Sequence, residues 1–88
     1  MSIIKPFSDK NNLKISASLY QLTVHSEDAY ATLTQICNKS GVPIEKVQDF
    51  LVGELAPFIL EKEGVEREFR FDWMYMNILP ILSLIDLK

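Results

Sequence analysis

Few side chains in this sequence belong to the types that carry catalysis or bind metal ions. His25 is the single histidine, and Ser26 follows it directly. A serine hydrolase needs its nucleophile, its base and an orienting group to converge, and adjacent side chains rarely face each other. Cys37 is the single cysteine, so no internal disulfide and no cysteine–histidine set for a metal can form. We expect Cys37 to be a small core residue, and His25 to be structural or solvent-facing.

Acidic side chains are more numerous, but their spacing does not predict an acid–base site. Glu61 and Glu63 form one closely spaced pair, and Glu66 and Glu68 form another. Two carboxylates divide the roles of acid and base only where their surroundings hold their pKa values apart, and this segment is too polar to enclose them. The three glycines lie in separate segments, which excludes a phosphate-binding glycine loop. The sequence therefore predicts no enzyme activity, no cofactor and no metal site.

The composition predicts one small acidic domain in the cytoplasm. Eighty-eight residues, 48% of them hydrophobic, suffice for one core. The amino-terminal residues lack the apolar stretch of a signal peptide, and the apolar segment from Trp73 to Leu87 is too short to span a bilayer. The formal net charge is −3, and the acidic excess lies between Glu45 and Asp72. Such a surface repels phosphate backbones and attracts basic partners, so we expect a protein partner and neither nucleic acid nor a membrane.

Periodic apolar residues predict a mainly all-α fold, a compact bundle of about four helices in one domain. The first helix is expected over about residues 9–23, after a loose segment at residues 1–8. A last helix is expected to begin after Asp72 and to bend at Pro80. Before that helix, residues 65–71 alternate apolar and charged side chains, which fits a loop or one short strand.

The ends of the two middle helices are predicted by capping and turn residues. Ser26 is expected to cap the second helix, and Gly41 is expected to end it in the left-handed conformation. Pro43 is expected in the first turn of the third helix, which runs to about Leu55. Pro57 then has to kink this helix or begin a new turn, because its ring clashes with the carbonyl four residues earlier.

The segment from Leu33 to Leu51 resembles a DNA-binding helix-turn-helix, with Gly41 in the turn. Contacts to bases and phosphates favour Arg, Lys, Asn and Gln on the exposed face of the second helix of such a motif. Here that face has Glu45 and Asp49, and Lys46 is its only cation. A DNA-binding regulator is therefore an alternative and not the leading hypothesis.

Three short patterns resemble those of a family of small uncharacterised bacterial helical domains. The first is Leu19-Tyr20, followed by an acidic turn and Tyr30. The second leads from Ile44-Glu45-Lys46-Val47 into the E-x-x-P pattern Glu54-Leu55-Ala56-Pro57, and the third is the F-D-W pattern Phe71-Asp72-Trp73. Domains of this size and charge are similar to immunity proteins, which neutralise bacterial toxins. The resemblance thus implies a helical protein-binding domain.

The leading hypothesis is a cytoplasmic immunity or inhibitor protein that covers the active site of a basic toxin domain. An acidic surface speeds and orients the capture of such a partner. The expected partner-binding residues are Glu45, Asp49, Glu61, Glu63, Glu66 and Glu68. Two alternatives remain open, the DNA-binding regulator, as a homodimer through the carboxyl-terminal helix, and an adaptor subunit with an apolar docking patch. The patch would contain Phe58, Trp73, Tyr75 and Met76.

Overall fold

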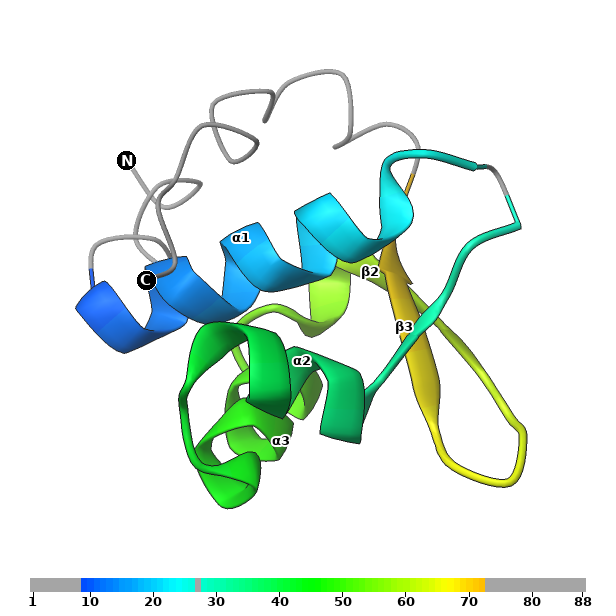
Figure 1. Ribbon diagram of the computed structural model, residues 1–88. Coiled ribbons are helices and arrows are strands. Elements are labelled where there is room, and N and C mark those ends of the chain that lie inside the picture. The colour runs from blue at the N-terminus through cyan, green and yellow to red at the C-terminus, as the bar shows by residue number, and fades with distance from the viewer. Residues whose placement is uncertain (1–8, 27, 73–88) are drawn as a thin grey trace.

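A computed structural model describes residues 9–26 and 28–72 of the chain (Figure 1). The loose segment predicted at residues 1–8 and the helix predicted after Asp72 lie outside the described residues. In chain order the elements are α1 (Lys10–Thr23), β1 (Ala31–Thr32), α2 (Leu33–Ser40), α3 (Ile44–Val52), the 3₁₀ turn η2 (Ala56–Phe58), β2 (Ile59–Lys62) and β3 (Glu68–Phe71).

Helix α1 forms where the apolar periodicity predicted it. The Asp9 carboxylate caps the helix, because its Oδ1 accepts hydrogen bonds from the amides of Asn11 at 2.8 Å and Asn12 at 3.2 Å. Every residue in 15–20 is buried, so this part of the helix is covered around its whole circumference. In Figure 1, α1 lies across α2 and α3 and reaches the sheet at its carboxyl-terminal end.

Helix α2 begins later than predicted. Thr32 and Gln35 form a capping box, in which the Thr32 Oγ1 accepts from the Gln35 amide at 3.1 Å and the Gln35 Oε1 accepts from the Thr32 amide at 2.9 Å. The prediction that Ser26 caps this helix is wrong, since its Oγ accepts from the Asp28 amide at 3.2 Å within a loop. The chain reaches the helix through the extended strand β1, whose pairing excludes a helix there.

The turn between α2 and α3 confirms the prediction for Gly41. This residue has φ 74° and donates its amide to the Cys37 carbonyl at 2.9 Å, a conformation that glycine adopts without steric cost. Pro43 precedes the first residue of α3, and the helix ends at Val52, earlier than the predicted Leu55. Together α2, the glycine turn and α3 form the expected helix-turn-helix pair.

The three strands form one antiparallel sheet in the order β1-β3-β2. Ala31 pairs with Phe69, so the segment between α1 and α2 is joined to the last described strand. Ile59 pairs with Phe71, and the β2–β3 hairpin extends away from the helices (Figure 1).

The prediction of an all-α four-helix bundle is wrong. The described part of the chain has three α-helices and a three-stranded antiparallel sheet, which is an α+β fold. Strand β3 does form within the alternating segment 65–71, but its two partners were not predicted. Strand β1 is too short to show a periodicity of two, and β2 follows directly from the 3₁₀ turn that contains Pro57.

One apolar core joins the helices to the inner face of the sheet. Its buried members are Ile15, Leu19, Tyr20, Ala31, Leu33, Ile36, Val42, Val47, Phe50, Leu51, Leu55, Phe69 and Phe71. The order helix, strand, two helices and hairpin, with the first strand beside the last, is the topology of a winged helix-turn-helix, in which the hairpin is the wing.

Candidate functional site

The candidate site consists of the outer face of α3 and the adjacent hairpin. In a helix-turn-helix the second helix is the one that contacts the ligand. Six residues of α3 are exposed, namely Ile44, Glu45, Lys46, Gln48, Asp49 and Val52. We call these residues together with residues 59–68 of the hairpin the α3–hairpin surface. All six acidic residues predicted to bind a partner lie on it, two on α3 and four on the hairpin.

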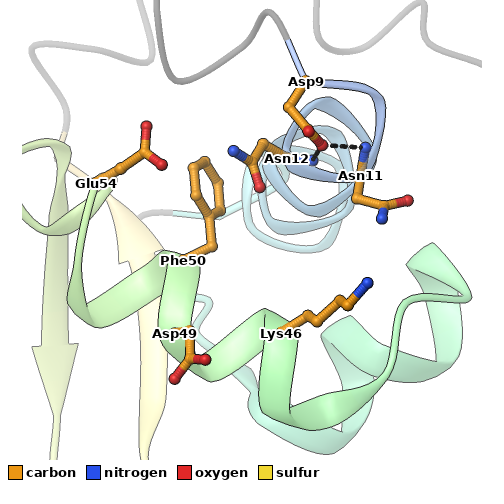
Figure 2. A pocket seen from close by; sticks show the side chains of 7 residues that line it. All are labelled: Asp9, Asn11, Asn12, Lys46, Asp49, Phe50 and Glu54. Atoms are coloured by element: carbon orange, nitrogen blue, oxygen red, sulfur yellow. Dashed lines mark hydrogen bonds between the residues drawn. The ribbon is translucent and has the colours of Figure 1, made fainter.

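The two acidic residues of α3 are both exposed. Glu45 lies in the first turn of the helix, where the helix dipole favours a negative charge. Asp49 lies one turn later and borders a hollow between α3 and the first turn of α1 (Figure 2). Both carboxylates are therefore accessible to a basic partner.

The hollow beside Asp49 is polar. It has a volume of about 270 Å³ and is lined by Asp9, Asn11, Asn12, Lys46, Asp49, Phe50 and Glu54. The lining includes three carboxylates and one ammonium group, and the Phe50 ring, which is only 5% exposed, lies next to Asn12 (Figure 2). Asp9 is occupied in capping α1. The lining contains no nucleophile paired with a base, so the hollow suits the charged end of a lysine or arginine better than a chemical reaction.

The acidic residues of the hairpin differ in whether they form hydrogen bonds or ion pairs with other residues of the domain. Glu61 forms a bidentate ion pair with Arg67, with Nε to Oε2 at 2.6 Å and Nη2 to Oε1 at 2.9 Å. The hydrogen bonds from Arg67 lower the pKa of Glu61, and the same bonds raise the pKa of Arg67. Both side chains are about 40% exposed, at 39% and 43%, so solvent screens this pair.

Glu66 has a structural role that the sequence analysis did not predict. Its Oε1 accepts from the Thr34 amide at 2.9 Å and from the Thr34 hydroxyl at 2.8 Å, which ties the hairpin to the first turn of α2. Glu68 is half-buried and lies close to Gly64, and Glu63 is exposed. Of the six predicted residues, Glu45, Asp49 and Glu63 are thus the exposed ones for which the described residues show no ion pair.

A second hollow lies between the end of α3 and the hairpin. It has a volume of about 240 Å³ and is lined by Leu51, Val52, Ala56, Ile59, Glu61 and Arg67. Four of these residues are apolar, and Val52 is 46% exposed. The Glu61–Arg67 ion pair borders the apolar part. We call this hollow the hairpin groove; no motif in the sequence indicated it, because its walls come from three separate elements.

Among the described residues, Arg70 is a buried charged side chain that the sequence analysis missed. It is 1% exposed, and its Nη1 donates to the carbonyls of Ser26 and Ala29, both at 2.9 Å. The guanidinium carbon lies 5.7 Å from the centroid of the Tyr30 ring. Arg70 therefore holds the loop between α1 and β1 against β3. The only sequence signal for this role is an arginine between two phenylalanines that point to the other face of the strand.

The residues first considered for catalysis are dispersed. His25 and Ser26 are exposed in the loop after α1, and Cys37 is half-buried against the core. Within residues 9–26 and 28–72, no cluster of three or more His, Cys, Asp or Glu side chains could hold a metal ion. None of the helices in the same part of the chain has the length and apolar character that a membrane span requires.

The α3–hairpin surface is thus the best candidate site, with an acidic outer face and an apolar groove at one side. Comparison of the chain with family models, with curated proteins and with solved structures finds no match.

Proposed function

We propose that this chain is a non-catalytic protein-binding domain that uses the α3–hairpin surface to bind a basic protein. The observation that carries the proposal is the charge of that surface. Its six carboxylates outnumber its three cations, Lys46, Lys62 and Arg67; the carboxylates are those of Glu45, Asp49, Glu61, Glu63, Glu66 and Glu68. The potential of such a surface attracts and orients a positively charged partner.

The cations of this surface are poorly placed for a nucleic acid. Arg67 is paired with Glu61, and the Lys62 ammonium lies 5.3 Å from the centroid of the Tyr30 ring. Lys46 lines the polar hollow together with acidic side chains. Binding to DNA depends on cations that replace counterions along the phosphates, and here each cation has an acidic or aromatic neighbour.

An immunity or inhibitor protein is the role that we propose within this class. The partner would be a basic toxin domain, whose active site the α3–hairpin surface covers. The resemblance to small immunity-like bacterial domains and the acidity of the surface both support this role. The resemblance is an argument from analogy, and the surface charge is the physical part of it.

A DNA-binding regulator is the second candidate, and one observation favours it. The helix-turn-helix pair with its wing is the arrangement that places a helix in the major groove. The acidic outer face of α3 opposes this use of the scaffold, so we rank it second.

Capture of a partner from the source cell separates the two candidates. The immobilised domain is expected to retain a basic protein in stoichiometric amount, identified by mass spectrometry, and to release it as the salt concentration rises. The variant Glu45→Lys is expected to lower the association rate by about threefold to tenfold, because steering falls with the charge of the surface. Asp28→Lys makes the same change of charge in the exposed loop after α1 and is expected to have a much smaller effect.

Specific retention of DNA at low salt with no protein captured would overturn the proposal and establish the regulator.

A further inference from the structure

Strand β2 is an edge strand, and its hydrogen-bonding pattern shows which main-chain groups point outward. The Asp72 amide donates to the Phe58 carbonyl at 3.0 Å, so these two residues form a hydrogen-bonded pair. In an antiparallel ladder such pairs recur every second residue, which makes Leu60–Arg70 and Lys62–Glu68 the next ones. The amide and carbonyl of Glu61 therefore point away from β3.

The outer edge of β2 is open in the part of the chain that the structure describes. The Ile59 amide is bonded to the Ala56 carbonyl, but the Ile59 carbonyl and both main-chain groups of Glu61 have no hydrogen-bond partner among residues 9–26 and 28–72. Unpaired edge groups of this kind accept an additional strand.

The hairpin groove lies on the same side as these open groups. Ile59 and Glu61 are opposite Phe71 and Phe69, so all four side chains share the inner face of the sheet. Of these, only the two residues of the edge strand line the groove, together with Leu51, Val52, Ala56 and Arg67. A strand added to β2 would place alternate side chains over this apolar floor.

The charge around the edge indicates which chain fits there. Glu61 and Glu63 flank the position that an added strand would occupy, and both are exposed. Glu61 is paired with Arg67, so Glu63 is the one of the two for which the described residues show no ion pair. A second copy of this domain, paired through β2 about a twofold axis centred at Glu61, would place Glu61 opposite itself. Shifting that pairing by two residues would oppose Glu61 and Ile59, whose amide is already bonded to Ala56. A basic segment of a different protein avoids the first difficulty, because it places no carboxylate opposite Glu61. It can bond to the amide and carbonyl of Glu61 and to the Ile59 carbonyl without using the Ile59 amide.

We infer that the partner binds by strand addition: an extended basic segment pairs with the open edge of β2 and inserts an apolar side chain into the hairpin groove. The apolar side chain lies beside Ile59 and Val52, and a lysine or arginine of the segment lies beside Glu61 and Glu63. Main-chain hydrogen bonds supply affinity in this mode, and the groove supplies specificity. The inference rests on the proposed function for the basic character of the partner.

The first test uses a displayed library of random decapeptides selected on the wild-type domain. Enriched peptides are expected to combine an apolar residue with a lysine or arginine two positions away, the spacing of side chains on one face of a strand. The variant Glu61→Pro removes the outward amide, and proline is tolerated at an edge position of this kind. Glu61→Ala removes the same carboxylate but keeps the amide. We expect Glu61→Pro to bind about tenfold more weakly than Glu61→Ala, since it lacks one main-chain hydrogen bond.

A second pair of variants tests the groove and does not depend on proline. Val52→Asp places a charge on the groove floor, and we expect it to weaken binding of the selected peptides by at least about tenfold. Val24→Asp alters a valine of similar exposure, 41% against 46%, at the end of α1 and is expected to bind like wild type. In the wild type, bound peptide is also expected to protect the Glu61 amide from hydrogen exchange.

Several results would overturn the inference. They are a failure to enrich any peptide, peptides that bind Glu61→Pro and Glu61→Ala equally, and an unprotected Glu61 amide in the complex. Protection of that amide in concentrated domain without peptide would assign the edge to a second copy. The proposed function and the strand addition can be tested separately. If a captured basic protein binds Glu61→Pro, Val52→Asp and wild type equally, the proposed function stands and only the strand addition is refuted.

Discussion

Two arginines of the hairpin, three positions apart, differ in almost every physical respect. Arg70 lies at the base of the hairpin, is 1% exposed and donates to two main-chain carbonyls of a distant loop. Arg67 lies near the tip, is 43% exposed in its side chain and pairs with Glu61 on the neighbouring strand. A buried guanidinium that is hydrogen-bonded to the main chain contributes to stability, whereas a solvated ion pair contributes little. The base of the hairpin therefore stabilises the fold, whereas the Glu61–Arg67 pair near its tip can change with little effect on the fold.

The largest expected effect on stability comes from removing the hydrogen bonds of Arg70 at the base of the hairpin. Arg70→Met retains much of the volume but removes the donors to Ser26 and Ala29, and it is expected to lower the free energy of unfolding by about 2 to 3 kcal/mol. Part of the loss is offset because the charge no longer has to be buried. Urea unfolding followed by circular dichroism measures the change.

Arg70→Lys serves as the matched control for this prediction. It keeps the charge, but one ammonium group does not reproduce the planar donor geometry of a guanidinium, so an intermediate loss is expected. A loss below about 0.5 kcal/mol for Arg70→Met, which is usual for surface substitutions, would contradict the distinction between base and tip.

A smaller effect is expected where the hairpin is tied to α2. Glu66→Ala removes the acceptor of the Thr34 amide and hydroxyl, and we expect it to lower the free energy of unfolding by about 1 kcal/mol, as for the loss of a helix cap. Glu66→Gln keeps a side-chain oxygen and is expected to lose less. Faster hydrogen exchange at the Thr34 amide in Glu66→Ala alone would locate the effect, and equal exchange in both variants would refute this role.

The smallest effect on stability is expected at the tip, where pH is the more sensitive probe. Hydrogen bonds from Arg67 hold the pKa of Glu61 below its ordinary value of 4.5, so the pair stabilises the fold above that pH. This contribution is lost as the pH falls through the lowered pKa of the folded state, when Glu61 becomes protonated. In Arg67→Gln the pKa of Glu61, measured by carboxyl NMR, is expected to rise towards 4.5.

The same comparison should respond to salt. Raising the ionic strength screens the exposed Glu61–Arg67 pair and is expected to reduce the difference in stability between wild type and Arg67→Gln. The difference between wild type and Arg70→Met should change much less, because that contact is buried. An equal response to salt in both variants would mean that base and tip do not differ in the way the structure indicates.

Local signals in the sequence predicted α1 and the turn between α2 and α3, but they did not predict the start of α2 or the two strands that pair with β3. The first helix follows from a run of apolar residues at steps of three and four, and the end of α2 follows from Gly41. The sequence also contains the Thr32 and Gln35 capping box, but Ser26 offered a competing cap with acidic residues after it. The pairing of Ala31 with Phe69 decides between them, and no local pattern reports a contact between residues so far apart in the chain.

The candidate site was likewise predicted only in those features that depend on local sequence. The sequence analysis named six acidic residues as partner-binding candidates, and all six lie within the α3–hairpin surface. It did not predict that Glu61 and Glu66 would be engaged within the domain, because their partners Arg67 and Thr34 reach them only through the turn of the hairpin and its packing on α2. The polar hollow and the hairpin groove were likewise not predicted, since each is built from elements that are separate in the chain.

The sequence by itself determined the acidity of this protein, the position of α1 and the glycine turn between α2 and α3, since composition, apolar periodicity and backbone freedom are local properties. Only the tertiary structure decided that β1 joins the sheet, that Arg70 is buried and that β2 presents an open edge beside an apolar groove. These features depend on which segments pair across long separations, and that choice is made by the packing of the whole core and not by any single segment.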